Sequence, residues 1–166
     1  MNEAELLVEL IPRLRRYARA LVGDRASADD LVQDTLERAW AKLHLYRRGT
    51  DLRAWLFTVM HNVHVNRVRA ARTTDTLEDD MPELAQRAAQ GDALLVRDLD
   101  RAIARLPAEQ RAVLLLVTLE EMSYEDAART LGIPIGTVMS RLSRAREKLR
   151  SMMLGQSAAA KLKVVK

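Results

Sequence analysis

Apolar residues recur at three- and four-residue spacing along most of this chain, which is the pattern of amphipathic helices. The first seventy residues hold three such stretches, at about 2–22, 27–43 and 51–71, separated by turn residues around Gly23 and Gly49. Pro12 lies within the first stretch and predicts a kink or a division of that helix. The apolar positions of this first helix are Leu6, Leu7, Leu10, Ile11, Leu14, Tyr17, Ala18, Leu21 and Val22.

The second stretch is predicted to begin near Ser27, because Asp30 follows three residues later as in an N-terminal capping motif. We assign Trp40, and Trp55 in the third stretch, to the hydrophobic core. The opposite face of the second helix is polar and acidic. Apolar positions of this helix are Leu31, Val32, Thr35, Leu36, Ala39, Trp40 and Leu43, and those of the third are Leu52, Trp55, Leu56, Val59, Val63 and Val68.

The same periodicity returns after residue 91, with one helix marked by Leu95, Leu99, Ile103 and Leu106 and a strongly apolar one after Pro107. Between the two halves, residues 73–92 carry six acids and one base, a net charge of −5 in a chain whose total is +4. We therefore predict an all-α protein of two small helical domains joined by a flexible acidic linker. The predicted units are a domain at 1–72, a linker at 73–91 with a short helical piece around 84–89, a domain at 92–154, and a fraying tail at 155–166.

Residues 122–150 have the layout of a helix-turn-helix. Ser123 is placed to cap the first helix with Asp126 three residues on, and Gly132 suits the left-handed position after that helix. Small and apolar residues (Ala127, Ala128, Leu131) are spaced to pack against Val138 and Leu142. On the second helix, one exposed face is predicted to hold Thr137, Ser140, Arg141 and Arg144, whose hydroxyls and guanidinium groups suit phosphates and base edges. The same helix also carries Arg146, Lys148 and Arg150. The alternative is a basic helical hairpin on a protein surface.

Composition excludes several function classes. There are no cysteines, so disulfides and thiolate metal sites are ruled out. No stretch approaches the ~20 apolar residues of a membrane span, and the acidic start lacks the basic region of a secretory signal, so we expect a cytoplasmic protein with no membrane insertion. His61 and His64 are three residues apart, but no further ligands stand at a convincing spacing for zinc. Neither a catalytic constellation nor a cofactor site is expected.

Four stretches resemble the extracytoplasmic-function sigma factors, group 4 of the sigma-70 family. The stretch 122–146 is similar to their C-terminal DNA-binding region, and the run from Leu106 to Leu116 is similar to the start of that region. "Ala28-Asp-Asp-Leu-Val-Gln-Asp-Thr-Leu-Glu-Arg-Ala-Trp40" and "Leu52-Arg-Ala-Trp-Leu-Phe-Thr-Val-Met-His-Asn62" resemble the core-binding and promoter-melting parts. The resemblance covers nearly the whole chain, in the same order and spacing.

The resemblance implies an alternative sigma factor without catalysis of its own, which binds core RNA polymerase and directs it to promoters. The acidic helix would dock on the clamp of the largest subunit through Asp30, Gln33, Asp34 and Glu37. The second domain would read the −35 element through Thr137, Ser140, Arg141, Arg144 and Arg146, beside the flap of the second-largest subunit. The −10 element would be opened and held by Tyr46, Arg47, Arg48, Asn62, Asn66, Arg69 and Arg72.

Further implications concern partners and specificity. The family resemblance implies a cognate anti-sigma factor, because two weakly coupled domains can be clamped together with their polymerase-binding faces covered. Met139 stands where the family commonly has a base and Asn66 where it often has Asp, so the promoter sequence stays open. Two rival functions are a polymerase-independent regulator, for which no receiver or dimerisation domain is visible, and a sigma-like decoy that sequesters an anti-sigma factor without binding DNA.

Overall fold

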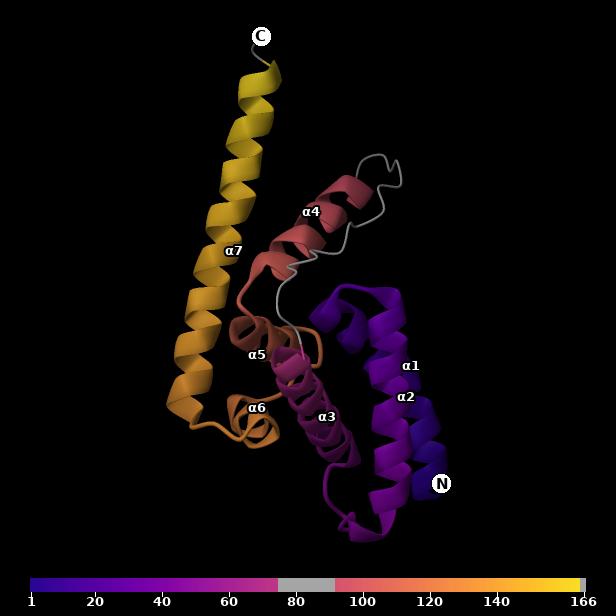
Figure 1. The fold of residues 1–166 in the computed structure, drawn as a ribbon. Helices are drawn as coiled ribbons and strands as arrows, with labels where there is room; N and C mark the ends of the chain where they lie inside the picture. The colour runs from indigo at the N-terminus through magenta and orange to yellow at the C-terminus, as the bar shows by residue number, and fades with distance from the viewer. Residues whose placement is uncertain (75–91, 165–166) are drawn as a thin grey trace.

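In the computed structural model, the backbone is described for residues 1–74 and 92–164, and every regular element in those two ranges is a helix (Figure 1). The predicted all-α class is therefore confirmed. The linker, with its expected helical piece at 84–89, lies outside the described residues. The first unit comprises α1 (Glu3–Val22), α2 (Arg25–Lys42), the short 3-10 turn η1 (Leu43–Leu45) and α3 (Leu52–Thr74). The second comprises α4 (Asp92–Arg105), α5 (Ala108–Thr118), α6 (Tyr124–Leu131) and α7 (Ile135–Val164).

Helix α1 begins at a capping box in which the Asn2 side chain accepts from the Glu5 backbone N–H at 2.9 Å. The Glu5 carboxylate in turn accepts from the Asn2 backbone N–H at 3.0 Å. The helix runs through Pro12 to Val22, so the predicted division is wrong. Buried Leu7 and Leu14 lie on either side of the proline and anchor both halves of the helix to the same core.

Two expectations for α2 are also wrong. Its N-cap is Asp24, whose carboxylate accepts from the backbone N–H groups of Ala26 and Ser27, so the helix begins before the predicted cap. Trp40 is 64% exposed and lies outside the core, because one residue beyond buried Ala39 is a rotation of about 100° around a helix. Trp55, by contrast, is half-buried and packs against the core as expected.

The helix-turn-helix of the second unit matches its prediction closely. The Ser123 hydroxyl accepts from the Asp126 backbone N–H at 3.1 Å, and Gly132 takes the left-handed conformation with φ 65°. Helix α7 begins two residues before Thr137 and continues to Val164, where the sequence predicted a frayed tail. Figure 1 shows its C-terminal half extending beyond the other helices. Ala127, Val138 and Leu142 are buried between α6 and α7, as predicted.

The two units pack directly against each other, which differs from the weak coupling expected from the linker. Helix α6 lies against α3, while α4 and α5 lie against α1, so that buried residues of both units form one continuous core. The N-terminal half of α4 contributes little to this core, because Leu95 and Leu99 are exposed. The two predicted DNA-binding regions are thus held in one compact molecule.

Candidate functional site

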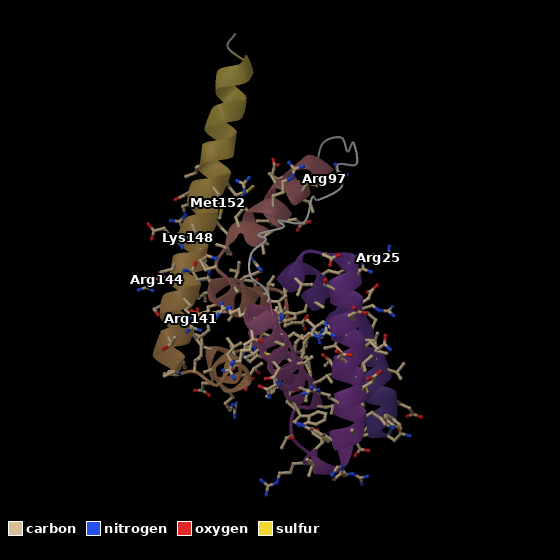
Figure 2. All side chains as sticks on the ribbon, viewed as in Figure 1. Arg25, Arg97, Arg141, Arg144, Lys148 and Met152 are labelled. Carbon is tan, nitrogen blue, oxygen red and sulfur yellow. The ribbon has the colours of Figure 1, made fainter. Side chains whose placement is uncertain are left out.

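The basic side chains of α7 occupy two faces of the helix rather than one. Ser140 and Arg144 are exposed, and Thr137 is half-buried on the same side. Figure 2 shows Arg144 projecting from the outer side of α7, whereas Lys148 lines a hollow with Arg105 and Pro107, where α4 ends and α5 begins. Arg146 is nine residues from Thr137, a rotation of about 180°, so the structure does not bring Arg146 together with the other predicted −35 residues.

Arg141 is engaged within the protein. Its Nη2 lies 3.4 Å from the Glu109 carboxylate at the start of α5, and the arginine side chain is only 26% exposed. Glu109 is well exposed, so this ion pair is weak and Arg141 can exchange it for another partner. The sequence placed Arg141 on the exposed face and gave no sign of the competing acid.

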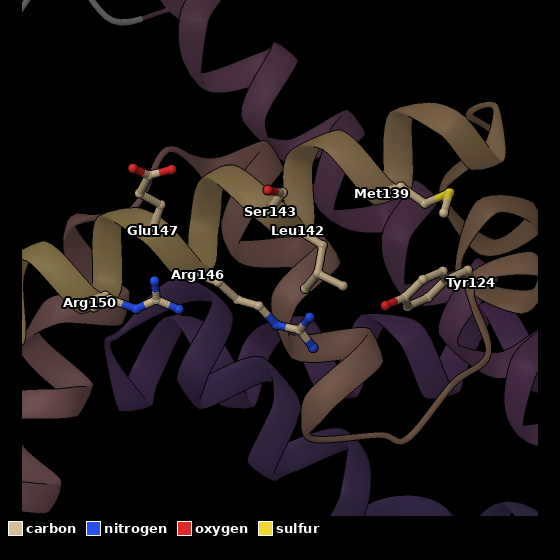
Figure 3. Close-up of a pocket in the computed structure, with 7 residues that line it drawn as sticks. All are labelled: Tyr124, Met139, Leu142, Ser143, Arg146, Glu147 and Arg150. Atoms are coloured by element: carbon tan, nitrogen blue, oxygen red, sulfur yellow. The ribbon is translucent and has the colours of Figure 1, made fainter.

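A hollow of about 350 Å³ lies beside the second basic face of α7 (Figure 3). The Arg146 guanidinium extends across it towards the Tyr124 ring, while Glu147 points away. Met139 and Arg150 complete the lining together with Leu142 and Ser143. Met139, Tyr124 and Arg150 were absent from the predicted −35 set. For Met139 and Arg150, helical spacing was a signal, since residues 139, 143, 146 and 150 share a face of α7, whereas Tyr124 lies on α6 and had no such signal.

Loop 46–50 is held in a defined conformation by its own side chains. The Tyr46 ring packs against Trp55 with 5.6 Å between centroids, and its hydroxyl donates to the Thr50 carbonyl. The Thr50 hydroxyl donates to the Arg47 carbonyl at 2.7 Å. Arg48, although 86% exposed, pairs with Glu3 at 2.7 Å, which ties the loop to the start of α1. Arg47 is exposed, so this aromatic and two arginines do lie together as predicted.

Helix α3 continues this site with a polar stripe. Asn62, Asn66 and Arg69 are exposed and share a face with Trp55, the residue on which Tyr46 packs. Arg72 is also exposed but is rotated about 80° from that line. The stripe therefore leads from the aromatic pair along α3, as a path for a single strand would require.

The predicted polymerase-binding residues do form one face of α2. Asp30, Gln33 and Glu37 are exposed, and the Gln33 amide donates to Glu37 at 3.4 Å. Asp34 is only half-exposed, because Arg67 of α3 pairs with its carboxylate and also donates to the Asp30 carbonyl at 3.2 Å. This internal pairing was not visible in the sequence, and it leaves Asp34 with less freedom than its neighbours.

Two histidines three residues apart on α3, His61 and His64, were the one sequence signal for a metal. Burial lowers the pKa of both His61 and His64, and His61 and nearby arginines lower that of His64 further. Among the described residues, no three His, Cys, Asp or Glu side chains gather as a metal site would need. Nor is any helix there long and apolar enough to cross a bilayer.

Two family matches divide the chain as the fold does. Residues 7–61 match the family described as the Sigma2 domain of PhyR, and residues 97–149 match Sigma-70, region 4. The ECF RNA polymerase sigma factor EcfG of Rhodopseudomonas palustris (strain TIE-1) is 37% identical over 149 residues, covering 89% of this chain and 82% of the relative.

Solved structures show the same likeness. The sigma factor RpoE from Bartonella quintana, solved in complex with the anti-sigma factor NepR, is 35% identical with a TM-score of 0.75, covering 90% of this chain and 95% of that one. The PhyRSL–NepR complex from Sphingomonas sp. Fr1 is 27% identical with a TM-score of 0.66, covering 91% and 88%. The order of elements, the helix-turn-helix and these matches agree: the chain belongs to the ECF RNA polymerase sigma factors.

Proposed function

We propose that this chain performs the activity of its family through three separate surfaces. It binds core RNA polymerase and directs promoter-specific transcription initiation, as a specificity subunit that leaves catalysis to the polymerase and needs no cofactor. Such a subunit works where the polymerase does, in the cytoplasm. The observation that carries the proposal is the presence on one chain of an exposed basic recognition helix and an exposed acidic face on α2.

In the second unit, α7 would enter the major groove of the −35 element. Ser140 and Arg144 are exposed at its outer side, and Arg141 becomes available once Glu109 releases it. Arginine reads guanine bidentately, with about 1–3 kcal/mol of discrimination per good pair. The Arg146 hollow lies on another face of α7, so we assign Arg146 to phosphate contact rather than to base reading.

In the first unit, loop 46–50 and α3 would hold the opened −10 strand. A ring beside two arginines offers stacking and phosphate neutralisation together, the combination that binds single strands. The amides of Asn62 and Asn66 supply donors and acceptors for base edges along the stripe. Asp30, Gln33 and Glu37 would meet basic residues of the polymerase clamp, with Arg67 orienting Asp34 beside them.

An anti-sigma factor is the further partner that we propose. A groove of about 900 Å³ lies between α1, α4 and α5, with Arg15 and Arg19 at its edge and Leu99 and Ile103 in its lining. This chemistry suits an amphipathic helix with an acidic face, and the similar RpoE is solved in complex with an anti-sigma factor, NepR. Arg19→Glu should weaken capture of the partner while leaving the recognition helix intact.

The decoy is the second candidate, favoured by one observation. The first unit matches a domain of PhyR, which the Bartonella quintana structures name as an anti-anti-sigma factor. A decoy has no need of a basic recognition helix, yet α7 exposes Arg144, Arg146, Lys148 and Arg150. Run-off transcription with core polymerase and a library of upstream sequences separates the two candidates. A promoter-specific transcript supports the sigma factor, and its absence together with anti-sigma binding supports the decoy.

A further inference from the structure

The contact between the two units buries a charged residue, Glu120, that no predicted site uses. Glu120 follows α5 and is 0% exposed, although its sequence context between two helices is that of a surface turn. Its side chain meets α1, where Arg13 Nε lies 3.3 Å from one carboxylate oxygen and Arg16 Nη2 lies 3.7 Å from the other. Arg53 of α3 reaches the same residue, but it donates to the backbone carbonyl of Glu120, at 2.7 Å.

These contacts compensate the buried carboxylate only in part. Neither carboxylate oxygen has a hydrogen-bond partner of acceptable geometry. Arg13 and Arg16 are 39% and 56% exposed, so water screens their attraction. A buried ion pair recovers the cost of desolvation only when its geometry is excellent and its remaining lone pairs are satisfied. The charged form of Glu120 is therefore better solvated outside this interface than within it.

The direction in which the pKa of Glu120 is shifted agrees with its incompletely compensated burial. Burial raises the pKa of Glu120 above its ordinary value, although Arg13, Arg16 and Arg53 act to lower it. Burial raises the pKa of Tyr17, a core residue of α1, and the negative charge of Glu120 raises it further. The surroundings of Glu120 thus favour a neutral group over a carboxylate.

The backbone beside Glu120 carries strain as well. Glu121 has φ 53°, and it is the one described residue other than glycine with a positive φ. A side chain in this left-handed region costs free energy that glycine would avoid. The turn that aims Glu120 at α1 is therefore held by the packing around it rather than preferred by the local sequence.

Separation of the units is required by the proposed function, on which this part of the reasoning rests. Elements at −10 and −35 lie about 25 base pairs apart, or roughly 85 Å at the spacing of duplex DNA. A compact chain of this length has a diameter of about 40 Å. Both DNA-binding surfaces can therefore engage one promoter only after α3 and α6 part.

We propose that Glu120 is a release group, meaning a buried and incompletely compensated carboxylate that destabilises the packed form of the two units. It thereby raises the fraction of molecules in which the units are separated. If the ion pairs with Arg13 and Arg16 were the dominant effect, Glu120 would instead be a latch, a residue that stabilises the packed form. The two roles predict opposite effects for a neutral isostere. Glu120→Gln removes the charge without changing the shape, so it stabilises the packed form if Glu120 is a release group and weakens that form if Glu120 is a latch.

The test measures the packed fraction directly in the free chain of 166 residues. The chain has no cysteine, so Ala41→Cys on α2 and Ser151→Cys on α7, both at exposed positions, can carry spin labels for pulsed electron paramagnetic resonance distances. For Glu120→Gln we expect a several-fold rise in the ratio of packed to separated populations. For Arg13→Met, which removes compensation but keeps length, we expect a several-fold fall.

The control is Glu121→Gln, which changes the charge of the exposed neighbour and should leave the distances as they are. If Glu120→Gln and Arg13→Met both favour separation, Glu120 is a latch and the proposal is overturned. It is equally overturned if Glu120→Gln leaves the ratio unchanged. Far-ultraviolet circular dichroism identifies any variant that has lost its helices, and the opposite signs expected for the two variants cannot arise from unfolding.

Transcription gives an independent readout. With core polymerase in limiting amount, Glu120→Gln should bind several-fold more weakly, because only the separated fraction is competent and the apparent dissociation constant rises as that fraction falls. Loss of all transcription by the unaltered chain would refute the sigma-factor function and leave the distance result standing. Normal transcription with unchanged distances would refute the release group alone.

Discussion

Tyr46 offers the sharpest test of the proposed −10 surface. Tyr46→Ala removes the ring that packs on Trp55 and, in our proposal, stacks an opened base. Stacking on an aromatic side chain is worth about 1–3 kcal/mol per base. At tenfold per 1.4 kcal/mol, that corresponds to about a 5- to 150-fold loss of affinity for the single-stranded −10 element. Binding to core polymerase should change little, because the acidic face of α2 is a separate surface.

Tyr46→Phe is the matched control. It keeps the ring and removes only the hydroxyl that donates to the Thr50 carbonyl, a bond worth about 0.5–1.5 kcal/mol for the order of the loop. Open-complex formation is followed by the fluorescence of a base analogue placed in the −10 element, and core binding by competition with a labelled chain. The reasoning fails if Tyr46→Ala reduces core binding as much as opening, or if Phe is as damaging as Ala.

Three other predictions follow from the described contacts. Glu109→Gln should free Arg141 and strengthen binding to −35 duplex by about 1.5- to 5-fold, as expected for an exposed pair worth 0.2–1 kcal/mol, and fluorescence anisotropy showing weaker binding would contradict it. In urea denaturation, Phe57→Ala should cost about 3–5 kcal/mol and Trp40→Ala less than about 1 kcal/mol; equal costs would return Trp40 to the core. Burial lowers the pKa of His64, so its contribution to stability is present above its unfolded value of about 6.5 and is lost as pH falls below it; His64→Gln should flatten the pH dependence of the urea midpoint, and an unchanged profile would refute this.

Local signals predicted the helix-turn-helix well because its geometry is decided within a few residues. Ser123 caps α6 and Gly132 ends it through interactions that span three or four positions. The error at Ser27 is of the same local kind, since Asp24 stands three residues earlier and offers a carboxylate to two backbone N–H groups. Trp40 was assigned to the core because its side chain is apolar, although its position around the helix does not fall on the buried face. Its position beside Ala39 already placed it off the buried stripe.

The charges that act between distant segments could not be predicted in this way. The Glu120 carboxylate pairs with Arg13, which lies in the other half of the chain and shares no periodic pattern with it. Asp34 and Arg67 are likewise 33 residues apart. Each acid appears in the sequence as an ordinary polar position. Only the packing of α2 against α3, and of α5 against α1, decides which acid becomes paired or buried.

The recognition helix and the segment after it form one continuous rod. Helix α7 has 30 residues, a length of about 45 Å, and its N-terminal turns carry the residues assigned to the −35 element. A rod of that length acts as a lever arm, because moving its far end sideways by about 5 Å turns the reading end by roughly 6°. Any body attached rigidly near Val164 would therefore set the angle at which α7 meets the groove, and a fusion at that end needs a flexible spacer to leave promoter choice unchanged.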